Sequence, residues 1–144
     1  HHCMRLIGAG QRCLELACQR VEDRETFGKK LSQHQSIREN IAKSYAELEM
    51  ARLLVHKTCW HIDHHGVKPS IELISATKIS VPLMIQAIID RCMQMHGAGG
   101  LTEDWCMAEQ FNYARWCRQA DGPDEVHQMA LGKRIIQQYA EASN

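Results

Sequence analysis

Three carboxylates lie within five residues near the end of the chain, in the run Ala-Asp-Gly-Pro-Asp-Glu-Val-His at 120–127. Asp124 and Glu125 suit the first turn of a new helix, where the helix dipole stabilises negative charge. Asp121 precedes Gly122 in the break between two helices, a position from which a side chain can face a pocket. A role in the turn does not explain why Asp121 lies in this break. Asp121 is therefore the carboxylate of this run that we consider for a chemical role.

A second chemical signal is the glycine-rich run at 97–100, Gly-Ala-Gly-Gly. Glycine allows a phosphate or a ring to approach the backbone closely. The run does not follow a predicted strand, so the dinucleotide fingerprint of a Rossmann unit is excluded. The alternative interpretation, a helix C-cap extended into a turn, stays open.

Metal binding is a third possibility, because helix bundles often hold metals. The sequence contains no Glu-x-x-His pair of the kind that binds di-iron centres. His61 and His65 share a helix face at i, i+4, with His64 and Asp63 between them. They lie beside Gly66 at a helix end, where cationic histidines complement the dipole, so a solvated structural role is favoured. A metal-binding helical protein remains the rival interpretation.

The seven cysteines lie in apolar helical patterns and include no C-x-x-C pair. They are Cys3, Cys13, Cys18, Cys59, Cys92, Cys106 and Cys117. We expect them to pack as small hydrophobic groups in a reducing compartment, and we therefore expect an intracellular protein.

The bulk composition narrows the class of partner. The 144 residues suit one domain, and 17 acidic residues balance 17 basic ones, so nothing calls for nucleic acid or an anionic membrane. No apolar run approaches the roughly twenty residues of a membrane span, and no signal segment opens the chain. The chain starts within a helical pattern without an initiating methionine, so we expect a piece of a longer protein.

Apolar residues recur three and four positions apart along most of the chain, which predicts a protein made almost entirely of helices. The expected helices cover residues 4–21, 33–65, 70–97, from 102 or 103 to 121, and 123–139. We expect Ser32 and Ser70 to cap the second and third helices. Residues 22–31 are expected to form a link anchored by Phe27 alone, and Pro82 is expected to kink the third helix.

The apolar positions of the first three helices predict the core. They are Leu6, Ile7, Cys13, Leu14, Ala17 and Val21 in the first; Ile37, Ile41, Tyr45, Leu48, Val55, Cys59 and Ile62 in the second; and Ile74, Val81, Ile85, Ile88, Cys92 and Met95 in the third. Long antiparallel helices joined by short turns predict an all-α, up-and-down four-helix-bundle-type domain with an extra C-terminal helix.

Four short motifs occur together in register. They are Arg24-x-Thr26-Phe27-Gly28-Lys29, His34-Gln35, Gln94-x-x-Gly97 with its glycine loop, and Asp121-Gly122. In order and spacing, across nearly all 144 residues, they resemble the C-terminal helical domain of the acyl-CoA dehydrogenases. The ending at 120–127 is similar to one branch, related to the dehydrogenases that are fused to a kinase-like domain in animals.

The resemblance implies that FAD is the cofactor and that several residues here contact it. Arg24 would contact the pyrophosphate of an FAD held mainly by a neighbouring subunit, because its planar guanidinium suits phosphate. The further contacts that the resemblance implies are Phe27 and Gln35 flanking the cofactor, and Gln94 with the backbone of Met95, Gly97 and Ala98 at the adenosine end.

The resemblance also gives Asp121 a role. It matches the glutamate that removes the proton alpha to the thioester carbonyl while a hydride leaves the beta carbon for the flavin. Aspartate is one methylene shorter, so the backbone at Gly122 must approach the substrate more closely. Most relatives next have Thr-x-Gln contacting the cofactor. Pro123 and Glu125 stand at those places, so that contact is not carried over.

The implied function is part of an FAD-dependent acyl-CoA dehydrogenase of fatty acid metabolism and beta-oxidation. This domain would supply the base, part of the FAD site and the interface of a homodimer or homotetramer. The implied partners are an acyl-CoA substrate and an electron acceptor flavoprotein, in mitochondria or peroxisomes of a eukaryote or the cytoplasm of a bacterium. The upstream helical and beta domains are absent, so we expect no turnover by this chain alone. The alternative is a non-catalytic oligomerisation bundle of the same fold.

Overall fold

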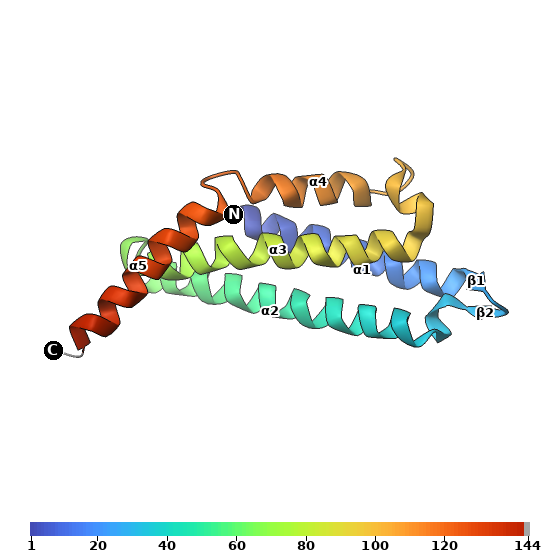
Figure 1. The fold of residues 1–144 in the computed structure, drawn as a ribbon, viewed down its shortest axis with the longest axis horizontal. Coiled ribbons are helices and arrows are strands. Elements are labelled where there is room, and N and C mark those ends of the chain that lie inside the picture. The colour runs from blue at the N-terminus through green and yellow to red at the C-terminus, as the bar shows by residue number, and fades with distance from the viewer. Residues whose placement is uncertain (143–144) are drawn as a thin grey trace.

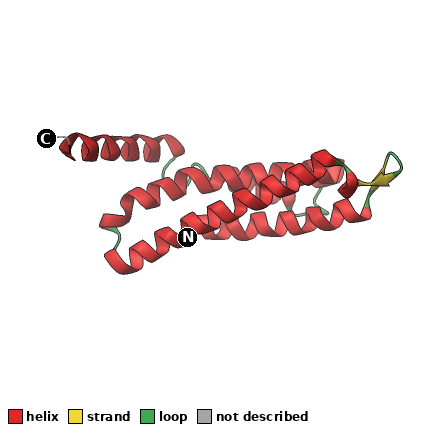
Figure 2. Ribbon diagram, turned by 90° about the horizontal axis from the view of Figure 1, so that it is seen from below, coloured by secondary structure: helices red, strands yellow, loops and turns green. Residues whose placement is uncertain are grey.

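The computed structural model describes residues 1–142 (Figure 1). Its helices are α1 (His2–Asp23), α2 (Gln35–His65), α3 (Ile71–His96), α4 (Met107–Cys117) and α5 (Asp124–Ala142). A hairpin of β1 (Glu25–Thr26) and β2 (Lys29–Lys30) and 3-10 turns at Leu31–Gln33, Lys68–Ser70 and Gly97–Leu101 connect them. The first four helices run up and down side by side, and α5 extends away from one end, as Figure 2 also shows. The predicted all-α bundle with an extra C-terminal helix is confirmed.

α3 is the central helix, because it packs against each of the other four. Five of its six predicted core positions are buried, and Ile74 is partly exposed. The stretch Lys68–Leu101, which contains α3, is long and apolar enough to cross a membrane by length and composition. The expectation that no apolar run is so long was therefore wrong. The central position of α3 accounts for its apolar character, because a helix that packs against four neighbours needs apolar side chains on most of its surface.

α1 buries all six residues that its apolar period predicted. α2 departs from its predicted seam. Leu48 and Val55 are buried, but Tyr45 is 62% exposed and Cys59 is exposed as well. The exposed positions lie between buried or partly buried ones, so the side that α2 buries is set by its contacts with α1 and α3 and not by a regular 3.5-residue repeat.

The segment between α1 and α2 contains a hairpin that the sequence did not predict. Phe27 and Gly28 both have positive φ, at 53° and 77°, which is the geometry of a tight two-residue turn. Phe27 is 97% exposed, so it does not anchor the segment in this chain. Leu31 packs against the core instead.

Neither predicted serine accepts a capping hydrogen bond from the first turn of its helix. α2 begins at Gln35 after His34, and Ser32 lies in the preceding 3-10 turn, where its carbonyl accepts from Arg38 Nε at 2.7 Å. Ser70 does precede α3, but its hydroxyl donates to the carbonyl of Gly66 at 2.6 Å. Pro82 lies inside α3 as expected, and a kink there stays a prediction.

α4 begins at Met107, later than the predicted start at residue 102 or 103. The hydroxyl of Thr102 donates to the carbonyl of Gly99 at 2.8 Å and contacts the Asp104 carboxylate, so this polar segment forms a turn. α5 follows the predicted span closely. Among its described residues only Asp124 is buried, which leaves the apolar side chains of α5 largely uncovered.

Candidate active site

The loop between α4 and α5 carries Asp121 in a strained conformation. Asp121 has a φ of 56°, and Gly122 follows with a φ of 101°. A left-handed conformation is unusual for a residue with a side chain and costs of order 1 kcal/mol or more. Such strain persists where the surrounding structure enforces it, and it is concentrated at functional sites.

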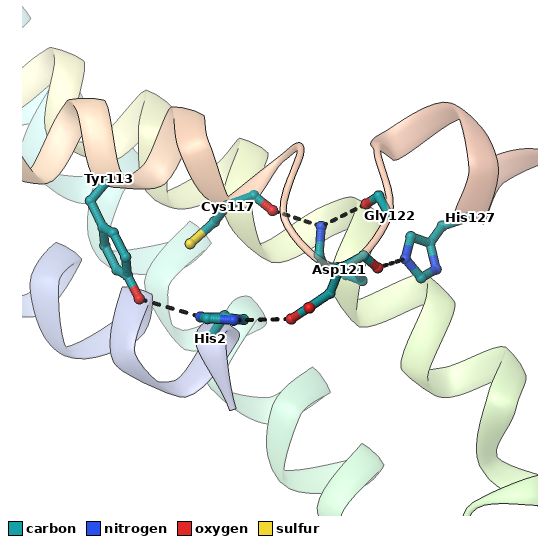
Figure 3. Close-up of polar contacts among 7 residues, drawn as sticks. His2, Tyr113, Cys117, Asp121, Gly122 and His127 are labelled. Atoms are coloured by element: carbon teal, nitrogen blue, oxygen red, sulfur yellow. Dashed lines mark hydrogen bonds and ion pairs between the residues drawn. The ribbon is translucent and has the colours of Figure 1, made fainter.

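The Asp121 side chain makes one ion pair, with an element far away in the sequence. Its Oδ2 lies 3.0 Å from Nε2 of His2, at the start of α1. The other nitrogen of His2 lies 3.5 Å from the hydroxyl of Tyr113, and His127 Nε2 lies 3.1 Å from the main-chain oxygen of Asp121 (Figure 3). The Asp121 side chain is 75% exposed. Sequence reasoning missed His2, since no spacing signal links residues 119 positions apart.

Asp121 lines a pocket of about 300 Å³ between α1, α2 and α3. Apolar side chains such as Val55, Ile62 and Ile74 form much of its wall. Lys78 and His127 are among its polar lining residues. The carboxylate therefore stands at the edge of a largely apolar pocket that is open to one side.

A second pocket, of about 490 Å³, lies at the other end of the bundle. It brings together five of the seven residues predicted to contact a cofactor: Arg24, Gln94, Met95, Gly97 and Ala98. Gly97 has a φ of 64° and ends α3, and a Cβ built there would meet no atom within 4 Å, so the backbone is open to close approach.

Two predicted cofactor residues do not line this pocket. Phe27 points into solvent at the tip of the hairpin, and the side-chain amide of Gln35 donates to Glu39 Oε1 at 2.7 Å. Sequence reasoning missed Arg20, which lines the pocket together with His96. Arg20 stands one helical turn before Arg24, and that i, i+4 spacing was the available signal.

The positive charge of this second pocket comes from its arginines. His96 is buried, which lowers the pKa of its imidazole below the ordinary value, and its Nδ1 donates to the carbonyl of Cys92 at 2.8 Å. The imidazole is therefore neutral near pH 7. Arg20 and Arg24 remain as the permanent cations beside the glycine loop, a combination suited to an anionic group such as a pyrophosphate.

The two pockets are well separated in one chain. Asp121 contacts His2 at the start of α1, whereas Arg24 follows the last residue of α1. A helix of 22 residues is about 33 Å long. The predicted base and the predicted pyrophosphate contact therefore cannot meet the same part of one cofactor molecule.

The histidine cluster at the end of α2 makes contacts of its own. His61 Nδ1 lies 2.8 Å from the hydroxyl of Ser70, and His64 Nδ1 lies 2.7 Å from the carbonyl of Trp60, on whose ring His64 stacks. Within residues 1–142 no group of three or more His, Cys, Asp or Glu side chains is arranged to hold a metal ion.

Comparison with models of protein families identifies the family of this chain. The model described as "Acyl-CoA dehydrogenase, C-terminal domain" matches residues 1–136 of the chain. The chain belongs to the acyl-CoA dehydrogenase family. Acyl-CoA dehydrogenase family member 10 of Mus musculus is 47% identical over 133 residues, which are 92% of this chain and 12% of that protein. This relative lies in the branch that the ending at 120–127 predicted.

Solved acyl-CoA dehydrogenases share the fold. One from Mycobacterium abscessus aligns with a TM-score of 0.94 and 40% identity, over 96% of this chain and 34% of that one. A glutaryl-CoA dehydrogenase from Mycobacterium smegmatis, in complex with FADH2, aligns with a TM-score of 0.87 and 28% identity, over 93% and 34% of the two chains. The chain spans 12–33% of the length of the first curated relatives it matches.

Proposed function

We propose that this chain supplies the catalytic base and part of the FAD site of an acyl-CoA dehydrogenase that forms a trans double bond between the alpha and beta carbons of an acyl-CoA. The observation that carries the proposal is the Asp121 carboxylate, held in a strained loop at the edge of a largely apolar pocket. Family membership supplies the substrate class.

The chemistry assigned to Asp121 is proton abstraction. Its carboxylate accepts the proton from the alpha carbon, and the electron pair of that C–H bond becomes the second bond between the alpha and beta carbons. FAD, when bound, takes up the hydride that leaves the beta carbon. The imidazole of His2 donates to Oδ2 of Asp121, which leaves Oδ1 to receive the proton.

The second pocket fits the diphosphate and adenosine portion of FAD. Arg24 offers a fixed cationic fork, and the open backbone at Gly97 allows close approach beside Gln94. Because this pocket is about one helix length from Asp121, we assign it to an FAD whose flavin lies in a neighbouring subunit. Phe27 and Gln35, exposed in this chain, are assigned to the same contact across the interface.

Oligomerisation into a homodimer or homotetramer is part of the proposal. α5 exposes Met129, Ile136 and Tyr139 by more than 70% each. Apolar side chains gathered on one protruding helix are characteristic of a surface that is covered in an assembly. An electron acceptor flavoprotein would then reoxidise the bound cofactor.

Substitution of Asp121 tests the proposal in the complete enzyme, meaning this chain together with the parts that its longer relatives possess. Asp121→Asn removes the basic oxygen while keeping the size of the side chain. We expect FAD content to stay normal and the rate of flavin bleaching by acyl-CoA to fall by about 10²–10⁴-fold, as for the loss of a general base. Glu125→Gln, which neutralises an exposed carboxylate of the same run, is the matched control and should keep the wild-type rate.

Flavin reduction at the wild-type rate in Asp121→Asn would reject Asp121 as the base. A purified wild-type protein that is colourless yet oligomeric would instead favour the non-catalytic bundle, since an enzyme of this class must carry flavin.

A further inference from the structure

Lys78, in the first third of α3, is buried to a degree that is rare for lysine. Its relative exposure is 8%, and its Nζ donates to the carbonyl of Cys117 at 2.6 Å and to the carbonyl of Gly122 at 3.2 Å. Both bonds are drawn in Figure 3. Two of the three donors of the ammonium group are therefore used on main-chain oxygens.

The ammonium group is buried without a counter-ion. Among residues 1–142 no carboxylate lies within ion-pair distance of Lys78 Nζ. The nearby thiols do not balance the charge, because burial raises the pKa of both Cys3 and Cys117 and keeps them neutral. Burying an unpaired charge is costly, and an apolar residue of similar size would fill this position in α3 at lower cost. Unlike an apolar residue, Lys78 can donate the two hydrogen bonds to the carbonyls of Cys117 and Gly122.

Those bonds lie on either side of Asp121. Cys117 is the last residue of α4, and Gly122 directly follows Asp121, so Lys78 joins the beginning and the end of the loop. The other side of the loop is closed by Arg118, whose Nε donates to Asp124 Oδ2 at 2.7 Å. A short loop bonded at both ends explains how Asp121 is kept at a φ of 56°.

We propose that Lys78 is a positioning residue that holds the Asp121 loop in the geometry needed to remove the alpha proton. The inference rests on the proposed role of Asp121 and adds a residue on a different helix to it. Lys78 lines the same pocket as Asp121, so the bonded carbonyls and the carboxylate belong to one local structure. A displacement of a base by about 1 Å can cost a factor of about 10² in rate, so the loss of this support should slow proton abstraction.

The test uses the complete enzyme with Lys78→Met, which keeps the volume and removes both donors, and Lys78→Gln, which keeps neutral N–H donors on a shorter side chain. Lys57→Met, at an exposed site on α2, is the matched control. For each variant the FAD content, the rate of flavin reduction at saturating acyl-CoA and the half-saturating acyl-CoA concentration are measured. Exchange of the alpha proton with D2O, followed by NMR, reports on the base alone.

For Lys78→Met we expect flavin reduction and alpha-proton exchange to fall together by about 10–100-fold, with FAD content and half-saturation within about twofold of the wild type. Lys78→Gln should fall between the two, and Lys57→Met should match the wild type. Flavin reduction within about twofold of the wild-type rate in Lys78→Met would overturn the proposal. A purely structural role would lower the melting temperature and FAD content but leave the rate per bound flavin unchanged, which would overturn it as well.

Three further outcomes can be told apart. If Lys78→Met does not fold, Lys78→Gln decides the matter, and a wild-type rate of exchange in that variant counts against the proposal. If Asp121→Asn retains the wild-type rate, the role of Asp121 is wrong, and the role of Lys78 fails with it. If Asp121→Asn is inactive while the Lys78 variants are fast, only the inference about Lys78 fails.

Discussion

At the scale of single residues, the carboxylate of Asp121 is constrained from three directions. His2 contacts one oxygen, Lys78 bonds main-chain carbonyls on both sides of Asp121, and the backbone of Asp121 is left-handed. Figure 3 draws the polar contacts around this loop. A base works only within hydrogen-bond reach of its proton, so constraint of this kind is useful in a residue one methylene shorter than glutamate. The place of Asp121 in a break between helices could be predicted from the sequence, and its role as the base stays a prediction. The contacts of His2 and Lys78 with this loop could not be predicted, because they join residues far apart in the sequence.

The buried thiol of Cys92 should make the stability of the protein depend on alkaline pH. Burial raises the pKa of this thiol from 9.0 to about 12. The unfolded chain ionises the thiol above pH 9, while the folded chain keeps it neutral until about pH 12. Its contribution to stability is therefore complete below pH 9 and is lost as the pH rises towards 12, by up to about 4 kcal/mol.

Urea unfolding at pH 8.5 and at pH 11 measures this effect. Cys92→Ala should lose less stability between the two pH values than the wild type. Val81→Ala also shortens a buried side chain of the same core but removes no titratable group, so its loss of stability relative to the wild type should be the same at both pH values. An equal loss of stability with pH in the wild type and in Cys92→Ala would contradict the prediction.

At the scale of elements, long periodic helices were predicted well and short irregular segments were not. α1 and α3 were located to within a few residues, because a 3.6-residue apolar period extended over many turns is an unambiguous signal. The hairpin at 25–30 escaped detection because its turn has Phe27 where Asn or Asp usually marks the left-handed position. Which positions of the α2 seam are exposed depends on the neighbours of α2, and this information is not local.

The glycine loop after α3 should be intolerant of side chains at Gly100. A Cβ there would lie 2.7 Å from the carbonyl oxygen and 2.9 Å from the Cα of Met93, and neither main-chain atom can move aside easily. We expect Gly100→Ala to destabilise the protein by about 1–3 kcal/mol and to disturb the pocket beside Arg24. Gly8→Ala, in α1, meets nothing within 4 Å and should stabilise it by about 0.5–1 kcal/mol.

Thermal unfolding of the two alanine variants checks this contrast. Both variants add the same methyl group, so opposite signs would reflect the helix propensity gained at Gly8 in α1 and the close approach of the backbone at Gly100 in the 3-10 turn. Equal melting temperatures for the two variants would mean that the turn at Gly97–Leu101 repacks at no cost.

At the scale of the whole molecule, the bundle separates the two candidate sites. The loop between α4 and α5, which carries Asp121, lies at one end, and the end of α1 and the glycine loop after α3 lie at the other (Figure 1). α1 and α3 span the distance between them. The sequence suggested residues for both candidate sites but contained nothing to say that they lie a helix length apart. The separation follows from the direction of α1, which begins beside one site and ends beside the other.

This separation leads to a test with mixed oligomers. If Arg24 of one subunit contacts the FAD of its neighbour, an oligomer of Asp121→Asn subunits and Arg24→Ala subunits contains complete sites. The FAD beside an intact Asp121 would receive its arginine from the Asp121→Asn subunit. If Arg24 served its own subunit, no site in the mixed oligomer would have both residues.

Co-expression of the two variants with different affinity tags, followed by tandem purification, isolates the mixed species. The Arg24→Ala homo-oligomer should lose FAD on gel filtration, because a cationic contact to the pyrophosphate is missing, and the Asp121→Asn homo-oligomer should keep FAD without reducing it. The mixed dimer should retain FAD after gel filtration in about half of its sites, those that have both Arg24 and Asp121, and acyl-CoA should bleach that retained flavin, as expected for a cyclic pair. Bleaching no greater than that of the Arg24→Ala homo-oligomer would place Arg24 and Asp121 at the same cofactor, which the length of α1 opposes.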